Sequence, residues 1–332
     1  MAANAPIKLV AIGGGTGLST LLAGLRRYIH SDQNSPSVSL TAIVTVTDDG
    51  RSSGRLRTEF EVLPPGDIRN CLVALADDDQ LLTRLFRHRF PGEGAVGGHS
   101  LGNLLLLALN QMSGDFLTAI EQAREMLGIK AKVLPSTLDN VDLIARLNGK
   151  TVRGQVAIKS QQTPIRELSL DPSDARALPA AVQAIKEADL ITLGPGSLFT
   201  SVIANLLVKG IADALRESPA KKIYICNAMT ELDETDGFTA EDHVLQLIAY
   251  APHLRLDYAL FNSAPISPEM RERYALEKAR MIEPPVDSFS KKGEIQFVSL
   301  PLASESRAVR HDPDKLSRAI FDVYLKNDRG IF

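Results

Sequence analysis

The stretch that decides the fold is Ile7–Ser19, which reads IKLVAIGGGTGLS. A short, mostly apolar run ends in a cluster of glycines, and leucines follow at the helical spacing of positions 18, 21, 22 and 25. This pattern predicts a buried first strand, a tight turn and the start of a helix. Such a junction presents backbone N–H groups and the positive end of the helix dipole to an anion. We therefore expect a phosphate-bearing ligand near Gly13–Gly17.

The spacing of the glycines separates this stretch from the common nucleotide-binding motifs. It is G-x-G-x-G, which differs from the G-x-G-x-x-G fingerprint of dinucleotide folds, and no Gly-Lys-Ser/Thr follows as it does in a P-loop. A glycine-rich turn that only packs the helix against the strand is the alternative. The residues that we expect at the ligand are Gly13, Gly14, Gly15, Thr16, Gly17 and Leu18.

The same alternation of strand and helix patterns continues along the rest of the chain. A run rich in Val, Ile and Thr covers Val38–Val46, and later β-like runs lie at 189–193, 222–226, 257–261 and 295–302. We expect one α/β domain over residues 1–332, a doubly wound, mostly parallel, Rossmann-like sheet with helices on both faces. Within it, residues 131–162 are expected to form a small antiparallel excursion, with short strands over 133–137, 141–147 and 151–158 and Asn148-Gly149 as a hairpin turn. A C-terminal helix is expected over 312–324, with Asp312 as its N-cap and Pro313 at its first position.

The bulk composition excludes several classes of protein. The chain has 332 residues, of which 44% are hydrophobic and 23% charged, and its formal net charge is −3. That charge gives no reason to expect nucleic acid as a partner. The N-terminus is short and polar, no apolar run is long enough to span a membrane, and the two cysteines fit a reducing compartment. We expect a cytoplasmic protein with no membrane insertion.

In doubly wound sheets, ligands bind beyond the carboxyl ends of the strands, where the strand order reverses. Two polar loops at later strand ends therefore matter. The first, Gly194-Pro195-Gly196-Ser197, repeats the strand, glycine turn and helix of the opening stretch, and a packing turn is the alternative. The second contains Asn227. We expect Gly194, Gly196, Ser197 and Asn227 at the ligand.

Acidic residues follow the second strand and open a later helix. Asp48 and Asp49 end the second strand, farther from the glycine loop than the ~20 residues usual for a ribose-binding acid. Asp48 is our candidate ligand contact, with a turn-capping acid as the alternative. Asp67 lies in Pro65-Gly66-Asp67-Ile68-Arg69-Asn70, where it could contact ligand or cap the following helix. Arg69 and Asn70 could reach phosphate or base edges.

His99 and Asn103 form a further polar group at a helix start, although a lone histidine is more often structural than functional. The sequence shows neither a Ser/His/Asp order, nor a His/Cys metal spacing, nor a cysteine nucleophile pattern. The residues therefore favour binding over an evident catalytic centre.

Five motifs occur in one order along the chain, namely AIGGGTGL at 11–18, TDDGRSSG at 47–54, PPGDIRN at 64–70, GHSLGN at 98–103 and GPGSL at 194–198. Together they resemble the YvcK-type gluconeogenesis factors. Those proteins are the bacterial branch of a superfamily that includes the phospholactate transferase of deazaflavin coenzyme synthesis, the CofD-like proteins. The resemblance covers nearly the whole chain.

The resemblance implies a cytoplasmic, Rossmann-like protein that binds nucleotide ligands, notably UDP-sugars such as UDP-N-acetylglucosamine. It also implies a role in cell shape and cell-wall precursor supply during growth on gluconeogenic carbon sources. Carried over by motif, Gly13–Leu18 would face the diphosphate, and Asp48, Asn70 and Asn103 would line the cleft. Arg310 would be a ligand-contacting or gating cation, with a surface arginine near a helix cap as the alternative.

Three functional hypotheses follow. The first is a nucleotide-sugar-binding regulatory protein without a catalytic role, which would have a regulatory protein partner and form a homo-oligomer. The second is a transferase that uses a nucleotide-activated donor, with Asp48 or Asp67 holding magnesium. The third and weakest is an NAD-binding protein. No metal or other cofactor is firmly implied by the residues.

Overall fold

The computed structural model describes residues 5–30, 36–161, 163–283 and 295–326. Its centre is a seven-stranded sheet in the order β10-β9-β8-β7-β1-β2-β3, in which every neighbouring pair is parallel. The strands are β1 (Ile7–Gly13), β2 (Val38–Val44), β3 (Lys132–Pro135), β7 (Leu190–Leu193), β8 (Lys221–Ile225), β9 (Tyr258–Asn262) and β10 (Gln296–Leu300).

Strand β1 lies in the interior of this sheet, between β2 and β7. Its side chains from Leu9 to Ile12 are at most 2% exposed, because a parallel strand covered on both faces is apolar throughout. The chain runs outward from β1 to β2 and β3, and then resumes on the other side at β7. The strand order therefore reverses between β1 and β7, and the predicted doubly wound α/β fold is confirmed.

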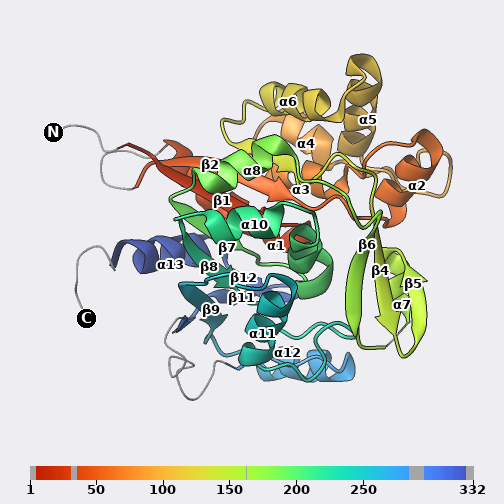
Figure 1. Ribbon diagram of the computed structural model, residues 1–332. Coiled ribbons are helices and arrows are strands. Elements are labelled where there is room, and N and C mark those ends of the chain that lie inside the picture. The colour runs from red at the N-terminus through yellow and green to blue at the C-terminus, as the bar shows by residue number, and fades with distance from the viewer. Residues whose placement is uncertain (1–4, 31–35, 162, 284–294, 327–332) are drawn as a thin grey trace.

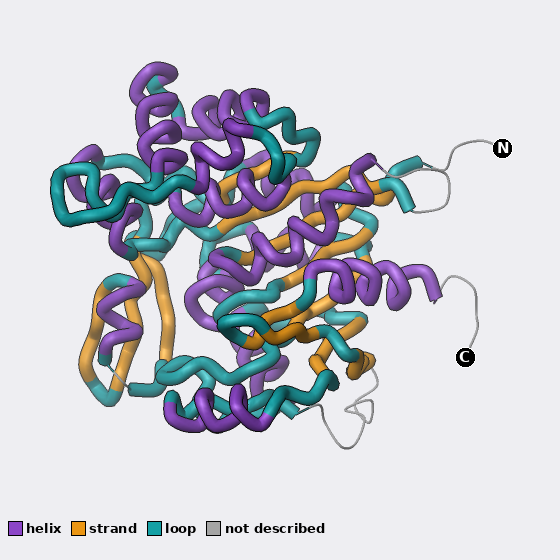
Figure 2. Tube along the Cα trace, turned by 180° about the vertical axis from the view of Figure 1, so that it is seen from behind, coloured by secondary structure: helices purple, strands orange, loops and turns teal. Residues whose placement is uncertain are grey.

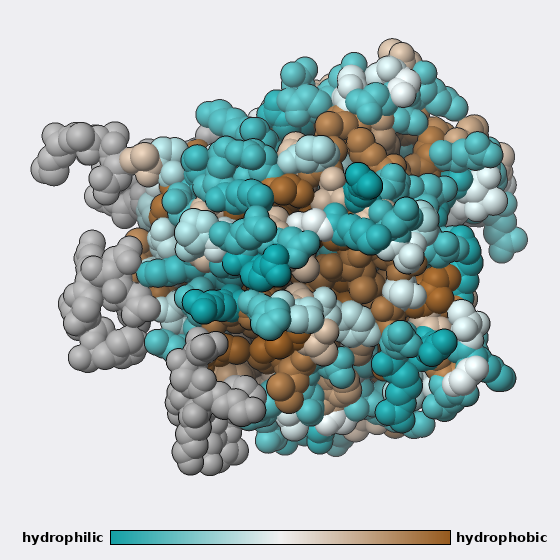
Figure 3. Space-filling model, in the orientation of Figure 1, coloured by the Kyte–Doolittle hydropathy of each residue, from teal (hydrophilic) through white to brown (hydrophobic). Residues whose placement is uncertain are grey.

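Helices cover both faces of the sheet. α1 (Gly15–Leu25) packs against α3 (Gly66–Leu75) and α13 (Pro313–Lys326), whereas α8 (Pro179–Lys186) and α10 (Ile211–Glu217) pack together on the face nearer the viewer in Figure 1. Figure 2 turns the α1 and α13 face toward the viewer. Figure 3, in the orientation of Figure 1, shows hydrophilic residues over most of the α8 and α10 face and apolar residues in the hollows between elements.

The remaining helical elements include η1, which follows α1 and precedes β2, and the helices that surround the sheet. They are η1 (Arg26–His30), α2 (Arg51–Phe60), α4 (Leu81–Arg87), α5 (Leu101–Ser113), α6 (Phe116–Met126), α7 (Gln155–Ser160), η2 (Leu198–Ile203), α9 (Ala204–Leu206), α11 (Ala240–Tyr250) and α12 (Pro268–Leu276). Among the described residues, none of the helices has both the length and the apolar character needed to cross a bilayer.

A three-stranded antiparallel sheet stands apart from the central one, in the order β5-β4-β6 (Figure 1). Its strands are β4 (Asp142–Leu147), β5 (Lys150–Arg153) and β6 (Glu167–Asp171). The hairpin between β4 and β5 turns at Asn148 and Gly149, with φ of 44° and 81°. Positive φ at both central residues is the type I′ geometry, so the predicted Asn-Gly turn is confirmed.

The predicted limits of this excursion, 131–162, are wrong at both ends. β3 pairs parallel with β2 as the edge strand of the central sheet, and the small sheet extends to residue 171. The predicted strand over 151–158 instead stops at Arg153. Gly154 takes a φ of 93° and helix α7 follows. Short β-branched runs fit parallel and antiparallel pairing equally well, so the sequence pattern could not separate the two.

The last two strands form a separate two-stranded hairpin. β11 (Ala303–Glu305) pairs antiparallel with β12 (Val309–His311), and β12 contacts α1. Helix α13 follows with Pro313 as its first residue. Asp312 Oδ1 accepts hydrogen bonds from the Asp314 and Lys315 amides, each at 3.0 Å, so the predicted helix cap at Asp312 is confirmed.

Candidate functional site

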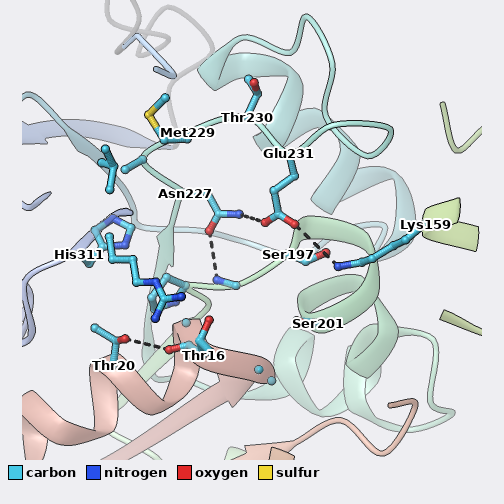
Figure 4. A pocket seen from close by; sticks show the side chains of 18 of the residues that line it. Thr16, Thr20, Lys159, Ser197, Ser201, Asn227, Met229, Thr230, Glu231 and His311 are labelled. Atoms are coloured by element: carbon cyan, nitrogen blue, oxygen red, sulfur yellow. Dashed lines mark hydrogen bonds and ion pairs between the residues drawn. The ribbon is translucent and has the colours of Figure 1, made fainter. Parts of the chain in front are cut away.

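A pocket opens where the strand order reverses, beyond the carboxyl ends of β1, β7 and β8 (Figure 4). It encloses about 310 Å³. α1 forms one wall, the loops after β7 and β8 form another, α7 reaches in from the small sheet, and β12 closes the remaining side. The lining includes Gly14, Gly15, Thr16, Gly17, Thr20, Gln155, Lys159, Pro195, Gly196, Ser197, Ser201, Asn227, Ala228, Met229, Thr230, Glu231, Tyr274, Val309, Arg310 and His311.

Some residues of the predicted glycine loop line the pocket, and others only pack against neighbouring elements. A Cβ on Gly17 would lie 2.4 Å from the Pro195 carbonyl oxygen, so this glycine lets α1 approach the loop after β7. Leu18 is fully buried in the core and does not line the pocket, and Gly13 does not line it either. The amides of Thr16 and Gly17 lie in the first turn of α1, where N–H groups have no partner within the helix. They can receive an anion.

Asp67 occupies an unexpected place beside this loop. Its Oδ2 accepts a hydrogen bond from the Gly15 amide at 2.8 Å, and it makes no cap for its own helix α3. The alternative prediction, that Asp67 caps the helix in which it lies, is therefore wrong, because its carboxylate caps α1 instead. Burial, followed by the nearby Asp48 charge, raises the pKa of Asp67 to about 7.

The loop after β7 forms the opposite wall. Gly194 and Gly196 have φ of 83° and 150°, a region that favours glycine. The Gly196 amide donates to Asn227 Oδ1 at 3.2 Å, and the Asn227 Nδ2 group donates to Glu231 Oε1 at 2.6 Å. Asn227 therefore ties the loop after β8 to the loop after β7 (Figure 4). Ser197 accepts a hydrogen bond from the Thr200 amide and begins η2.

A group of ion pairs lies where α7 reaches the pocket, and it was not predicted from the sequence. Lys159 Nζ lies 3.1 Å from Glu234 Oε1 and 4.0 Å from Glu231 Oε2, and the Glu234 side chain is 2% exposed. Burial, followed by the Glu234 charge, raises the pKa of Glu231 to about 7. Burial alone would lower the pKa of Lys159, but the two glutamates raise it. Lys159 was missed because α7 was expected to be a strand.

Four predicted residues gather outside the pocket together with Ser52, which was not predicted. We call this group the polar cluster: Ser52, Arg69, Asn70, His99 and Asn103. Ser52 Oγ lies 2.9 Å from His99 Nδ1 and accepts a hydrogen bond from Asn103 Nδ2 at 2.9 Å. Arg69 Nη2 donates to Asn70 Oδ1 at 2.6 Å. These side chains bond mainly to one another, and none of them lines the pocket.

Burial shapes the chemistry of the polar cluster. It lowers the pKa of Arg69 to about 10, with the Arg89 charge as the next cause, and it lowers the pKa of His99, where Arg55 adds to the effect. Two buried polar atoms, Arg69 Nε and Asn103 Oδ1, find no partner among the described residues.

Asp48 lies between the polar cluster and the pocket. Its Oδ1 accepts a hydrogen bond from the Gly50 amide at 2.9 Å, and its charge acts on Asp67. The described residues contain no group of three or more histidine, cysteine, aspartate or glutamate side chains arranged to hold a metal ion.

Arg310 and His311 bring the β12 side of the pocket into the site. The described part of the chain records no hydrogen bond or ion pair for the Arg310 guanidinium, which is exposed at the pocket. His311 was not singled out from the sequence, although it follows Arg310 directly. Among the predicted ligand residues, the pocket collects Gly14, Gly15, Thr16, Gly17, Gly196, Ser197, Asn227 and Arg310. Gly13, Leu18, Asp48, Asp67, Arg69, Asn70, His99, Asn103 and Gly194 lie outside its lining.

Comparison with known proteins identifies the family. The family model described as 2-phospho-L-lactate transferase CofD matches residues 9–302. The chain belongs to the CofD family. The gluconeogenesis factor of Halalkalibacterium halodurans is 41% identical over 315 residues, covering 95% of both chains. The gluconeogenesis factor of Bacillus subtilis is 40% identical over 317 residues, covering 95% of this chain and 98% of the relative.

The family relation extends to a crystal structure. A member of the UPF0052 family from Bacillus halodurans is 41% identical and superposes with a TM-score of 0.89. The match covers 96% of this chain and 100% of that one. The resemblance predicted from the five motifs is thereby confirmed, together with the α/β fold.

Proposed function

We propose that this chain binds a nucleotide sugar, such as UDP-N-acetylglucosamine, and acts as a cytoplasmic regulatory protein of the gluconeogenesis-factor type. The cellular role that goes with the proposal is normal cell shape and cell-wall precursor supply on gluconeogenic carbon sources. A regulatory protein partner and a homo-oligomer are part of the same proposal. The names of the relatives support the general role, and the pocket supports the ligand.

One observation carries the ligand assignment. The first-turn amides of α1 and the Arg310 guanidinium line the same pocket at the reversal of strand order. Helix amides and a free arginine are complementary to phosphate oxygens. The volume of about 310 Å³ is near the lower end for small-molecule sites, which suits a diphosphate and part of its flanking rings.

Calorimetric titration with UDP-N-acetylglucosamine tests the proposal. Hydrogen bonds to a charged group contribute about 1.5–3 kcal/mol, so Arg310→Ala should weaken binding by about 10- to 100-fold. Arg318→Ala removes an exposed arginine of α13 outside the pocket and serves as the matched control, with unchanged affinity. The absence of binding by the unaltered protein at millimolar ligand would refute the proposal.

Magnesium-dependent transfer from a nucleotide-activated donor is the second candidate, favoured by the CofD family match and by the proximity of Asp48 to Asp67. Two carboxylates with phosphate oxygens and water would suit magnesium. This candidate predicts magnesium-dependent turnover that Asp48→Asn abolishes. NAD is the weaker alternative ligand, and competition of NAD against the UDP-sugar separates the two.

A further inference from the structure

Glu231 places a carboxylate in a pocket that is otherwise suited to an anion. The first-turn amides of α1 and the Arg310 guanidinium line this pocket, and among its described lining residues Glu231 is the one acidic side chain. A carboxylate repels the like charge of a diphosphate at short range. Glu231 is therefore suited to a ligand group other than phosphate.

The Glu231 side chain is held in position, yet one of its oxygens is open to a ligand. Its Oε1 accepts a hydrogen bond from Asn227 Nδ2 at 2.6 Å, and its backbone amide donates to Thr235 Oγ1 at 2.9 Å. The side chain is 35% exposed. Its Oε2 lies 4.0 Å from Lys159 Nζ, which is too far for a hydrogen bond, and the described residues record no other partner for this oxygen. Figure 4 shows the carboxylate between Asn227 and Lys159.

The neighbouring charges do not saturate this oxygen. Lys159 Nζ lies nearer to Glu234, at 3.1 Å from its Oε1, and the Glu234 side chain is 2% exposed. One ammonium thus faces two carboxylates, so the group carries a net negative charge when all three are ionised. Burial, followed by the Glu234 charge, raises the pKa of Glu231 to about 7, which is typical of a carboxyl group at a functional site.

The chemistry of Oε2 limits what can bind there. An ionised carboxylate only accepts hydrogen bonds, so its partner must be a donor. The oxygens of a diphosphate diester are acceptors, whereas the hydroxyls of a hexose or a ribose can donate. A hydrogen bond from a hydroxyl to a charged acceptor is also stronger than one between neutral groups.

We propose that Glu231 is a specificity-determining residue whose Oε2 accepts a hydrogen bond from a hydroxyl group of the hexose or ribose that flanks the diphosphate. The inference rests on the proposed function and assigns the side of the pocket where α7 enters to a hydroxyl-bearing ring. The phosphates then lie toward Arg310 and the start of α1.

Calorimetric titration of the full-length protein with UDP-glucose and its deoxy analogues tests the inference. One series of analogues lacks single ribose hydroxyls, and the other lacks single hexose hydroxyls. We expect one analogue to bind about 5- to 20-fold more weakly than UDP-glucose, because it leaves Oε2 without its donor. The series in which this loss occurs distinguishes the ribose from the hexose.

Glu231→Gln separates a hydrogen bond from mere proximity. The substitution keeps an oxygen for Asn227 Nδ2 but removes the charge at the position of Oε2. If Oε2 accepts the hydroxyl, UDP-glucose should bind this variant about 5- to 20-fold more weakly, and the critical analogue should show no such loss. If the carboxylate only repels the diphosphate, UDP-glucose should bind the variant more tightly.

Glu125→Gln is the matched control, because it neutralises an exposed glutamate of α6 outside the pocket lining and should leave the affinity unchanged. Glu231→Asp is the second variant if Glu231→Gln does not fold. It keeps the charge, withdraws the oxygens by one methylene group, and should show the same selective loss.

Three results would overturn the inference: equal binding of every analogue by the unaltered protein, unchanged or tighter binding of UDP-glucose by the Glu231 variant, or an equal loss in that variant for UDP-glucose and every analogue. No binding of UDP-glucose or UDP-N-acetylglucosamine by the unaltered protein would instead overturn the proposed function.

Discussion

The pocket and the polar cluster are both built from loops that follow strands and from helix starts, yet they treat their polar groups differently. In the pocket, the Arg310 guanidinium has no recorded partner among the described residues, and Glu231 Oε2 has no recorded hydrogen bond to any of them. In the polar cluster, Ser52 links His99 to Asn103 by two hydrogen bonds, and the atoms that lack a partner there, Arg69 Nε and Asn103 Oδ1, are buried rather than exposed at a pocket. A polar motif can therefore serve a ligand or hold its own loops together.

The difference follows from where each group lies relative to the reversal of strand order. The pocket lies beyond the carboxyl ends of β1 and β7. The chain connections leave these two strands in opposite directions along the sheet, and this leaves a crevice between them. The polar cluster joins α2, α3 and the start of α5, and α5 packs against both of the other helices. Asp67 connects the two regions. It accepts a hydrogen bond from the Gly15 amide at the pocket, and the charge of Asp48 on its other side raises its pKa.

The largest expected effect is at Gly17, where the pocket wall depends on backbone contact. In Gly17→Ala the Cβ would lie 2.4–2.7 Å from the backbone of Pro195 and Gly196, so α1 and that loop must separate. We expect a loss of about 3 kcal/mol in the free energy of unfolding, typical of forced overpacking, together with loss of UDP-sugar binding. Urea denaturation and calorimetric titration measure both.

Gly15→Ala is the control for that variant. Its Cβ would meet only Ser201 Oγ, at 3.8 Å, so the strain comes from the φ of 60° and amounts to about 1 kcal/mol. Equal destabilisation by the two alanines would show that the close approach at Gly17 does not form the pocket wall.

The sequence predicted the elements whose signals are local. The strand, glycine turn and helix at Ile7–Ser19, the Asn148-Gly149 turn and the Asp312 cap each depend on neighbouring residues, and the structure confirms them. The partition of polar residues between the pocket and the polar cluster depends on contacts such as Asp67 to Gly15, which are 52 residues apart. No local pattern carries that information.

The place of Lys159 at the pocket could not be predicted from the sequence either, because it also depends on contacts between distant residues. Whether it enters the pocket depends on the helix after Gly154 and on contacts that bring the small sheet to the main one. The Val156 amide donates to Asp49 Oδ1 at 2.9 Å, and Gln155 Nε2 donates to Thr200 Oγ1 at 3.2 Å. An acidic pair at Glu231 and Glu234, shortly after a strand end, was the available signal for a buried cation nearby.

The next effect concerns the carboxylate that connects the two regions. With a pKa of about 7 in the folded state and about 3.9 unfolded, Asp67 keeps its proton after the unfolded chain has lost it. Stability therefore falls as the pH rises from about 4 to 7, by at most about 1.4 kcal/mol per pH unit. Asp67→Asn cannot ionise and keeps an acceptor for the Gly15 amide.

We therefore expect Asp67→Asn to lose less stability than the unaltered protein between pH 5 and pH 7.5, by on the order of 2 kcal/mol. Urea midpoints at the two pH values measure the difference. Asp115→Asn is the control, because that exposed cap carboxylate has its pKa lowered by Thr118 and is ionised across the range. Parallel pH profiles for Asp67→Asn and the unaltered protein would mean that Asp67 is already ionised in the fold.

The smallest effect distinguishes the two regions most directly. Asn103→Ala removes the donor to Ser52 inside the polar cluster, where the side chain is 1% exposed. A buried polar group left unpaired costs about 1–2 kcal/mol of unfolding free energy, whereas UDP-sugar affinity should change less than about threefold because Asn103 does not line the pocket. Asn110→Ala, farther along the same helix α5, controls for helix propensity. A tenfold loss of affinity at unchanged stability would instead extend the ligand site into the polar cluster, as the sequence motifs predicted.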